Sequence, residues 1–199
     1  MNSLAPVTSI SSTLLNSKND AGMIHQGLKT IHATSDRLMQ FVDSFRQVTR
    51  IPLPEKSPFC ILDLLNDTKA LIDCRDVALN ICVEPQDTMI YADKVQLQQV
   101  FVNLIKNAVE ACLLRGGERY VEVCSRIAVD EKIYIEVSNN GGAIPLDIAE
   151  NIFTPFFTTK REGTGIGLAV SKQIIRLHGG FLRLSHNSDE KVTFLVVLE

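Results

Sequence analysis

The first fifty residues carry a stripe of small and apolar side chains with the period of a packed α-helix. Its positions alternate between spacings of four and three residues, and such a heptad pattern drives helices to pack with a left-handed supercoil. The members are Ile24, Leu28, Ile31, Ser35, Leu38, Val42 and Phe45. A shorter stripe precedes it, at Leu4, Val7, Ser11 and Leu14. Turn-forming residues 16–20 separate the two stripes, so the sequence predicts a helical hairpin.

This hairpin predicts an oligomer. Two antiparallel helices with one narrow stripe each bury little apolar surface, whereas two hairpins together form a four-helix bundle. We expect a homodimer through residues 1–50. The alternative is that the hairpin packs against the remainder of its own chain.

A linker at residues 51–57 then separates the hairpin from a second domain at 58–199. Pro52, Pro54 and Pro58 fall within seven residues and prevent the helix from continuing. Beyond them, helical and strand patterns alternate. The predicted helices are 61–72, a long one capped by Asp93 that runs to Arg115, and 164–178. The predicted strands are 77–83, 88–91, 120–128, 132–137, 181–185 and 191–198. The fold class is therefore α+β, with helices layered on one face of a mixed sheet.

Composition narrows the possible functions. Hydrophobic residues make up 45% of the chain, which is enough for a core, and the net charge of −3 without a basic patch excludes a nucleic-acid surface. The five cysteines show no CxxC spacing, so we interpret them as reduced thiols of a cytoplasmic protein. No apolar run is long enough to span a membrane.

Four polar or glycine-rich segments are candidates for chemistry. Asn103 and Asn107 lie one helical turn apart with Lys106 beside them, and Mg²⁺ in a nucleotide site needs few protein oxygens. Residues 139–145 follow a strand and contain small residues that allow a flat ligand to approach the backbone. Residues 152–160 combine aromatic anchors with a polar end, and residues 163–168 form a glycine-rich turn before a helix, where amides can face phosphates. Each segment alone is a weak signal.

Together, in this order and spacing, they resemble the N, G1, F and G2 boxes of the GHKL ATP-binding family, over residues 56–199. The resemblance implies a Bergerat-type α/β sandwich that holds ATP and Mg²⁺ beneath a lid loop. It assigns Asn107 to Mg²⁺, Asn103 and Lys106 to phosphates, Asn139 to the adenine amino group, and Thr193 to adenine through water. The remaining residues that it places around the nucleotide are Gly141, Ala143, Ile144, Phe157, Thr158, Thr159, Lys160, Gly163, Thr164, Gly165, Gly167 and Leu168.

Within this family, one sequence position distinguishes the kinases from the hydrolases. In the hydrolases of this family a glutamate activates water where this chain has Asn103, and an amide lacks a suitable basic site. The predicted hairpin also resembles the dimerisation domain of sensor histidine kinases of the nitrogen-regulation (NtrY) type. The implied function is transfer of the ATP γ-phosphate to a histidine, for relay to a response-regulator receiver domain. The alternative is a non-catalytic module that binds ATP and dimerises.

Three departures from the family pattern stand out. Asn139 replaces an aspartate and is the weaker acceptor, while Ala143 replaces a glycine. The acceptor histidine and the acid after it are expected upstream of Met1, which places a truncation inside the dimerisation domain and leaves no catalytic residue here. His25 and His32 lack an adjacent acid, and His178 suits a helix C-terminus as an imidazolium. We expect no self-phosphorylation, and a parent protein anchored to a membrane through another segment.

Overall fold

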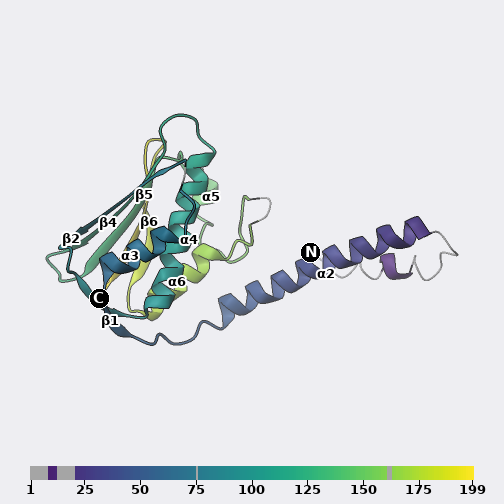
Figure 1. Ribbon diagram of the computed structural model, residues 1–199, viewed down its shortest axis with the longest axis horizontal. Helices are drawn as coiled ribbons and strands as arrows, with labels where there is room; N and C mark the ends of the chain where they lie inside the picture. Colours follow the sequence, from purple (N-terminus) through teal and green to yellow (C-terminus); the bar gives the residue numbers. More distant parts are fainter. Residues whose placement is uncertain (1–8, 13–20, 75, 161–162) are drawn as a thin grey trace. The chain divides into compact units, whose positions relative to one another are not determined.

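The computed structural model describes residues 9–12, 21–74, 76–160 and 163–199, and the chain divides into two units, residues 1–50 and 51–199. In the first unit, helix α2 (Ala21–Thr49) carries the long heptad stripe (Figure 1). Most of the predicted preceding helix lies outside the described residues, so the hairpin stays a prediction. Several stripe residues of α2 are exposed in the single chain, namely Ile24, Leu28, Val42 and Phe45.

The second unit contains a mixed sheet of five strands among its described residues. Its order is β2–β4–β5–β7–β6, with β2 and β4 parallel and the other neighbours antiparallel. The strands are β2 (Ala78–Glu84), β4 (Tyr120–Ile127), β5 (Ile133–Asn139), β6 (Phe181–Asn187) and β7 (Val192–Leu198). All five were predicted from the sequence, with ends shifted by up to two residues.

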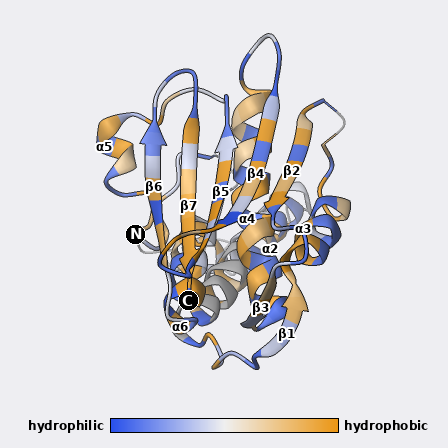
Figure 2. Cartoon of the chain, turned by 90° about the vertical axis from the view of Figure 1, so that its left-hand side faces the viewer, coloured by the Kyte–Doolittle hydropathy of each residue, from blue (hydrophilic) through white to orange (hydrophobic). Residues whose placement is uncertain are grey.

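Helices α3 (Ile61–Ala70), α4 (Lys94–Leu113) and α6 (Gly167–Leu177) cover one face of this sheet (Figure 1). The α+β prediction, with helices layered on one face of a mixed sheet, is therefore confirmed for this unit. Along the strands, apolar residues are interleaved with polar ones (Figure 2). Val121 and Val123 of β4 are fully buried on the helix side, as is Leu97 of α4. Each such side chain stabilises the fold by about 1.5–3 kcal/mol relative to an exposed one.

The sequence prediction missed two short elements. Strand β1 (Ser57–Cys60) pairs antiparallel with β3 (Met89–Ala92), although Pro58 suggested a linker. Proline is tolerated there because β1 is an edge strand. The single-turn helix α5 (Leu146–Ala149) follows β5 and is too short to show a period.

The start of α4 is fixed by its capping residue. The Asp93 carboxylate accepts hydrogen bonds from the backbone N–H groups of Val95 and Gln96, both at 3.0 Å. From the sequence, Gln96 is also placed to complete a capping box with Asp93, but its side chain does not reach back to the Asp93 backbone. Its Nε2 instead donates to Pro52 O at 3.0 Å, which ties the linker to α4.

His178 joins the end of α6 to the start of α4. Its Nε2 accepts a hydrogen bond from Asp93 N at 3.1 Å, and its Nδ1 lies 2.8 Å from Ile174 O. The ring is buried and links the end of α6 to the start of α4.

Candidate nucleotide-binding site

The two asparagines of α4 face the same side of the helix but make different contacts. Asn103 Nδ2 donates to Gly167 O and to Ser171 Oγ, both at 3.3 Å, and thereby ties α4 to the first turn of α6. Ser171 is fully buried and was not singled out from the sequence. Asn103 thus carries an amide donor at the position where a general base would need a carboxylate.

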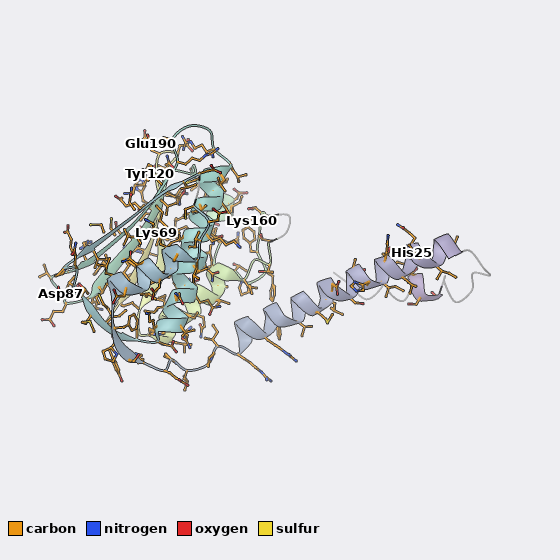
Figure 3. The ribbon with its side chains drawn as sticks, viewed as in Figure 1. His25, Lys69, Asp87, Tyr120, Lys160 and Glu190 are labelled. Atoms are coloured by element: carbon orange, nitrogen blue, oxygen red, sulfur yellow. The ribbon has the colours of Figure 1, made fainter. Side chains whose placement is uncertain are left out.

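Asn107 lies one turn further along α4 and accepts a hydrogen bond from the loop before α6. Lys160 Nζ lies 2.7 Å from Asn107 Oδ1, and it also forms an ion pair with Glu110. Figure 3 shows Lys160 on this loop, which is 150–166 in sequence. Glu110 in turn lies 4.0 Å from Lys106 Nζ. Four polar side chains therefore converge at this surface of α4, and an oxygen that accepts from an ammonium group can also ligate Mg²⁺.

Glu110 had not been singled out as a site residue. Its only sequence signal is the spacing of four from Lys106, which is common on solvated helix faces. Its partnership with Lys160 spans fifty residues of sequence and needs the fold to bring the two together.

The loop before α6 is closed by a backbone contact between the third and fourth candidate segments. Phe156 N donates to Gly165 O at 2.9 Å. Gly165 has φ +68°, and a Cβ at this position would lie 2.6 Å from the Phe156 carbonyl carbon. Only glycine fits here, so the turn before α6 is specified by close approach as well as by backbone conformation.

Aromatic packing anchors the loop. The Phe153 and Phe194 rings meet edge to face with centroids 6.3 Å apart, and Lys172 Nζ lies 4.8 Å above the Phe153 ring. Phe157 is half-buried. These contacts agree with the predicted role of the aromatic segment as an anchor.

The polar end of the loop is open to solvent. Thr158, Thr159 and Thr164 are exposed, and Thr158 Oγ1 accepts from Lys160 N at 3.1 Å. Gly163 lies against Thr158, where a Cβ would meet Oγ1 at 2.6 Å. Helix α6 begins with Gly167 and Leu168 as its first two residues. The first backbone N–H groups of any helix lack intrahelical partners, so this end of α6 favours an anion.

Asn139 occupies the carboxyl end of β5 and is 3% exposed. Its Oδ1 accepts a hydrogen bond from Gly141 N at 2.9 Å. Gly141 itself lies directly on α4, since a Cβ there would be 2.6 Å from both the carbonyl carbon and Cβ of Ala111. This close approach brings the end of β5 against the helix that carries Asn103 and Asn107.

The loop after β5 is held by the β6–β7 hairpin. Asn187 accepts from Ile144 N at 2.8 Å and donates to Ile144 O at 2.7 Å, and Asp189 Oδ1 accepts from Ala143 N at 3.3 Å. The sequence identified Asn187 and Asp189 only as turn residues. Ala143 does not have positive φ, so replacing the usual glycine introduces no backbone strain.

Thr193 lies on β7, where its hydroxyl has a partner within the sheet. The Thr193 hydroxyl lies 2.9 Å from Ser138 Oγ, and these two residues are partners across β5 and β7. Neighbouring residues of a strand point to opposite faces, so Thr193 lies on the face opposite Asn139. The β7 residue paired with Asn139 is Val192. The contact of Thr193 with adenine through water stays a prediction.

In the described part of the chain, no helix is long and apolar enough to cross a membrane. The same residues hold no group of three or more His, Cys, Asp or Glu side chains that could bind a metal. A Mg²⁺ ion held by one asparagine and by phosphates does not require such a group.

Residues 92–199 match the family described as Histidine kinase-, DNA gyrase B-, and HSP90-like ATPase. Two relatives are the Sensor protein FixL of Bradyrhizobium diazoefficiens and the Sensory histidine kinase/phosphatase NtrB of Rhizobium leguminosarum bv. phaseoli. FixL is 39% identical over 62% of this chain and 24% of that protein. NtrB is 30% identical over 82% of this chain and 46% of that protein. The chain thus spans about a quarter to a half of these relatives.

Solved structures show the same fold. The catalytic domain of histidine kinase ThkA, in a nucleotide-free form, aligns with a TM-score of 0.64 at 30% identity, over 72% of this chain and 95% of that one. ThkA in complex with response regulator protein TrrA aligns with a TM-score of 0.68 at 24% identity, over 99% of this chain and 58% of that one.

Proposed function

The chain belongs to the family of histidine kinase-, DNA gyrase B- and HSP90-like ATPases, and from this premise we propose that it presents Mg²⁺-ATP to a protein histidine. The nucleotide would lie between α4, the loop after β5 and the loop before α6. The observation that carries this proposal is the pairing of Lys160 Nζ with Asn107 Oδ1 at 2.7 Å. It brings a neutral oxygen ligand and a cation to one point of the site.

Asn107 would hold Mg²⁺ through Oδ1, and the ion would neutralise charge on the phosphates. In the structure Lys160 Nζ lies against this oxygen, so an ion held by Asn107 would take the place of the ammonium group, which would then be near the phosphates. Lys106, on the same face, adds a second cation. Phosphoryl transfer depends mostly on such positioning and charge stabilisation.

The contacts of Asn103 favour transfer over hydrolysis. Its amide donates to Gly167 and Ser171, and an amide offers no basic site that takes a proton from water near neutral pH. The acceptor is then a protein nucleophile. We infer that it is a histidine encoded upstream of Met1, as in sensor kinases of the NtrY type.

The wider assignments follow from the same proposal. Residues 1–50 form part of a dimerising and phosphoacceptor domain, 51–57 a linker and 58–199 the catalytic domain. The phosphohistidine passes its phosphoryl group to the receiver domain of a response regulator. The whole protein works at the cytoplasmic side of a membrane to which another segment anchors it. Support comes from the relatives, which carry the names of sensor kinases.

Phosphotransfer in trans tests this function. The 199-residue chain is mixed with a longer form that begins upstream of Met1 and carries Asn107→Ala, so that only the shorter chain retains an intact site. With γ-labelled ATP, the longer form should gain acid-labile label, and the shorter chain should gain none. Acid-labile label on the shorter chain would instead assign the acceptor to His25 or His32. Release of free phosphate without protein label would identify a hydrolase.

A further inference from the structure

Two free cysteines occupy paired positions on neighbouring strands of the five-stranded sheet. Strands β2 and β4 run parallel at one edge of this sheet (Figure 1), and Cys82 of β2 is the register partner of Cys124 of β4. Neighbouring strands lie about 4.8 Å apart. Disulfide-bonded cysteines have their Cα atoms about 4.4–6.8 Å apart. The register therefore places the two Cα atoms at a separation that a disulfide can bridge.

Both thiols lie on the face of the sheet opposite the helices. Val83 of β2 and Val123 of β4 are buried beneath the helices, and successive residues of a strand point to opposite faces. Cys82 and Cys124 each neighbour one of these valines in the sequence, so both point the other way. Cys82 is exposed and Cys124 is half-buried. A small molecule in solution can therefore reach Cys82 directly.

The two thiols are close enough to influence each other. Burial has the largest effect on the pKa of the Cys124 thiol and raises it, and the neighbouring thiol of Cys82 raises it further. Glu122 and Glu136 act in the same direction. Because the thiolate is the reactive form of cysteine, the exposed Cys82 is the thiol that reacts first.

We propose that Cys82 and Cys124 form a reversible disulfide site that reacts with peroxides. The Cys82 thiolate attacks one oxygen of a hydroperoxide, ROOH, and the O–O bond breaks. This step leaves Cys82 as a sulfenic acid, and the departing RO⁻ takes up the proton that the thiol lost. The Cys124 sulfur then attacks the Cys82 sulfur, and the hydroxyl group leaves as water with the Cys124 proton. Two thiols and one peroxide thus give one disulfide, one alcohol and one water, and the peroxide gains the two electrons that the thiols lose.

The position of the pair makes this bond reversible and gives it a measurable effect. Exposed disulfides are the ones that other thiols reduce readily. The bond would close a ring over residues 82–124, which contains the whole of α4 and joins the edge strand β2 to β4. A disulfide stabilises mainly by restricting the unfolded chain, so the oxidised protein should unfold at a higher urea concentration.

Peroxide treatment of the 199-residue chain, followed by alkylation and peptide mass spectrometry, tests the proposal. The wild-type chain should yield peptides joined through Cys82 and Cys124, with a mass lower by two hydrogen atoms. At fixed peroxide the rate should not depend on protein concentration, because the partners lie in one chain. Excess dithiothreitol should restore both thiols, and the urea midpoint should rise on oxidation and return on reduction. No nucleotide takes part, so the result is independent of the proposed function.

Three serine variants separate the roles of the thiols. Cys124→Ser removes the thiol that attacks second, so Cys82 should stop at the sulfenic acid and be trapped by dimedone. Cys82→Ser should form neither the disulfide nor a dimedone adduct at Cys124. Cys60→Ser is the matched control, because it removes a half-buried thiol from β1 and should form the disulfide as wild type does.

The proposal would be overturned if all five cysteines of the oxidised wild-type chain were still alkylated. Oxidation of Cys82 to the sulfinic acid without a link to Cys124 would also overturn it. The same holds if the link formed faster at higher protein concentration, or if it persisted in excess dithiothreitol.

Discussion

Three asparagine side chains of the candidate site each make a different kind of hydrogen bond. Asn103 uses its NH₂ group to hold α6, while Asn107 uses its oxygen toward Lys160. Asn139 uses its oxygen toward the backbone of Gly141. Because an amide carries both a donor and an acceptor, the function of each depends on which atom the fold has already engaged.

The close contact between Gly141 and α4 leads to a prediction at this scale. Gly141→Ala forces a Cβ to within 2.6 Å of Ala111 backbone and side chain. Overpacking of this kind costs about 1–3 kcal/mol of unfolding free energy. Gly116→Ala is the control, because nothing lies within 4 Å of its Cβ and its φ is not positive. Urea unfolding should show the loss for Gly141→Ala alone, and equal stabilities would show that α4 yields to the added methyl group.

The sequence predicted the asparagines and glycines of the site but missed their partners. Glycine-rich turns and amides at a helical spacing are local patterns, and they can be found in one sequence. The contact of Glu110 with Lys160 spans 50 residues, that of Ser171 with Asn103 spans 68, and that of Asn187 with Ile144 spans 43. No local pattern in the sequence marks these three residues.

At the scale of elements, the long periodic segments were predicted, whereas two of the short ones were not. Helix α4 and strand β4 are long enough to show their periods, and both were found. Strand β1 has four residues and contains Pro58, and α5 is a single turn. These two are formed by pairing with β3 and by the loop that follows β5, which are tertiary effects.

The cap of α4 gives a prediction with a definite pH dependence. Burial raises the pKa of Asp93, but hydrogen bonds from the backbone N–H groups of Gln96, Glu55 and Val95 outweigh it, so the pKa is lowered. A lowered pKa in the folded state means that the charge contributes stability above the pKa of the unfolded chain. This contribution is lost as the pH falls through the folded value.

Asp93→Asn keeps a good N-cap but removes this titration. Urea unfolding at about pH 6 should therefore show wild type more stable than Asp93→Asn, and the difference should shrink by about pH 3. A difference that grows on acidification would contradict the assignment of this charge to the cap.

The stripe on α2 predicts self-association. Leu38 belongs to the stripe, and Met39 beside it is 61% exposed and lies off the stripe. A buried charge without a partner is costly, so Leu38→Asp should turn a dimer into a monomer, whereas Met39→Asp should not. Light scattering of the two variants beside wild type measures this directly. A monomeric wild type, or equal effects of the two substitutions, would refute the dimer.

At the scale of the molecule, the described features converge on one region of the second unit. The sheet supplies Asn139 at the end of β5, α4 supplies Asn107, and the loop before α6 supplies Lys160. These residues come from three separate parts of the sequence, and the order of the five strands together with the covering helices brings their elements together. The family match over residues 92–199 covers all three.

The central claim is that Asn107 and the surrounding cations bind a nucleotide through Mg²⁺. Titration calorimetry with ADP, with and without Mg²⁺, tests it most directly on wild type and Asn107→Ala. Loss of one ligand oxygen from the metal should weaken Mg²⁺-dependent binding by about tenfold, as for a hydrogen bond to a charged group, and leave binding in a chelator nearly unchanged. The claim would be contradicted if Asn107→Ala lost equal affinity with and without Mg²⁺, or if the affinity of the wild-type chain did not depend on Mg²⁺.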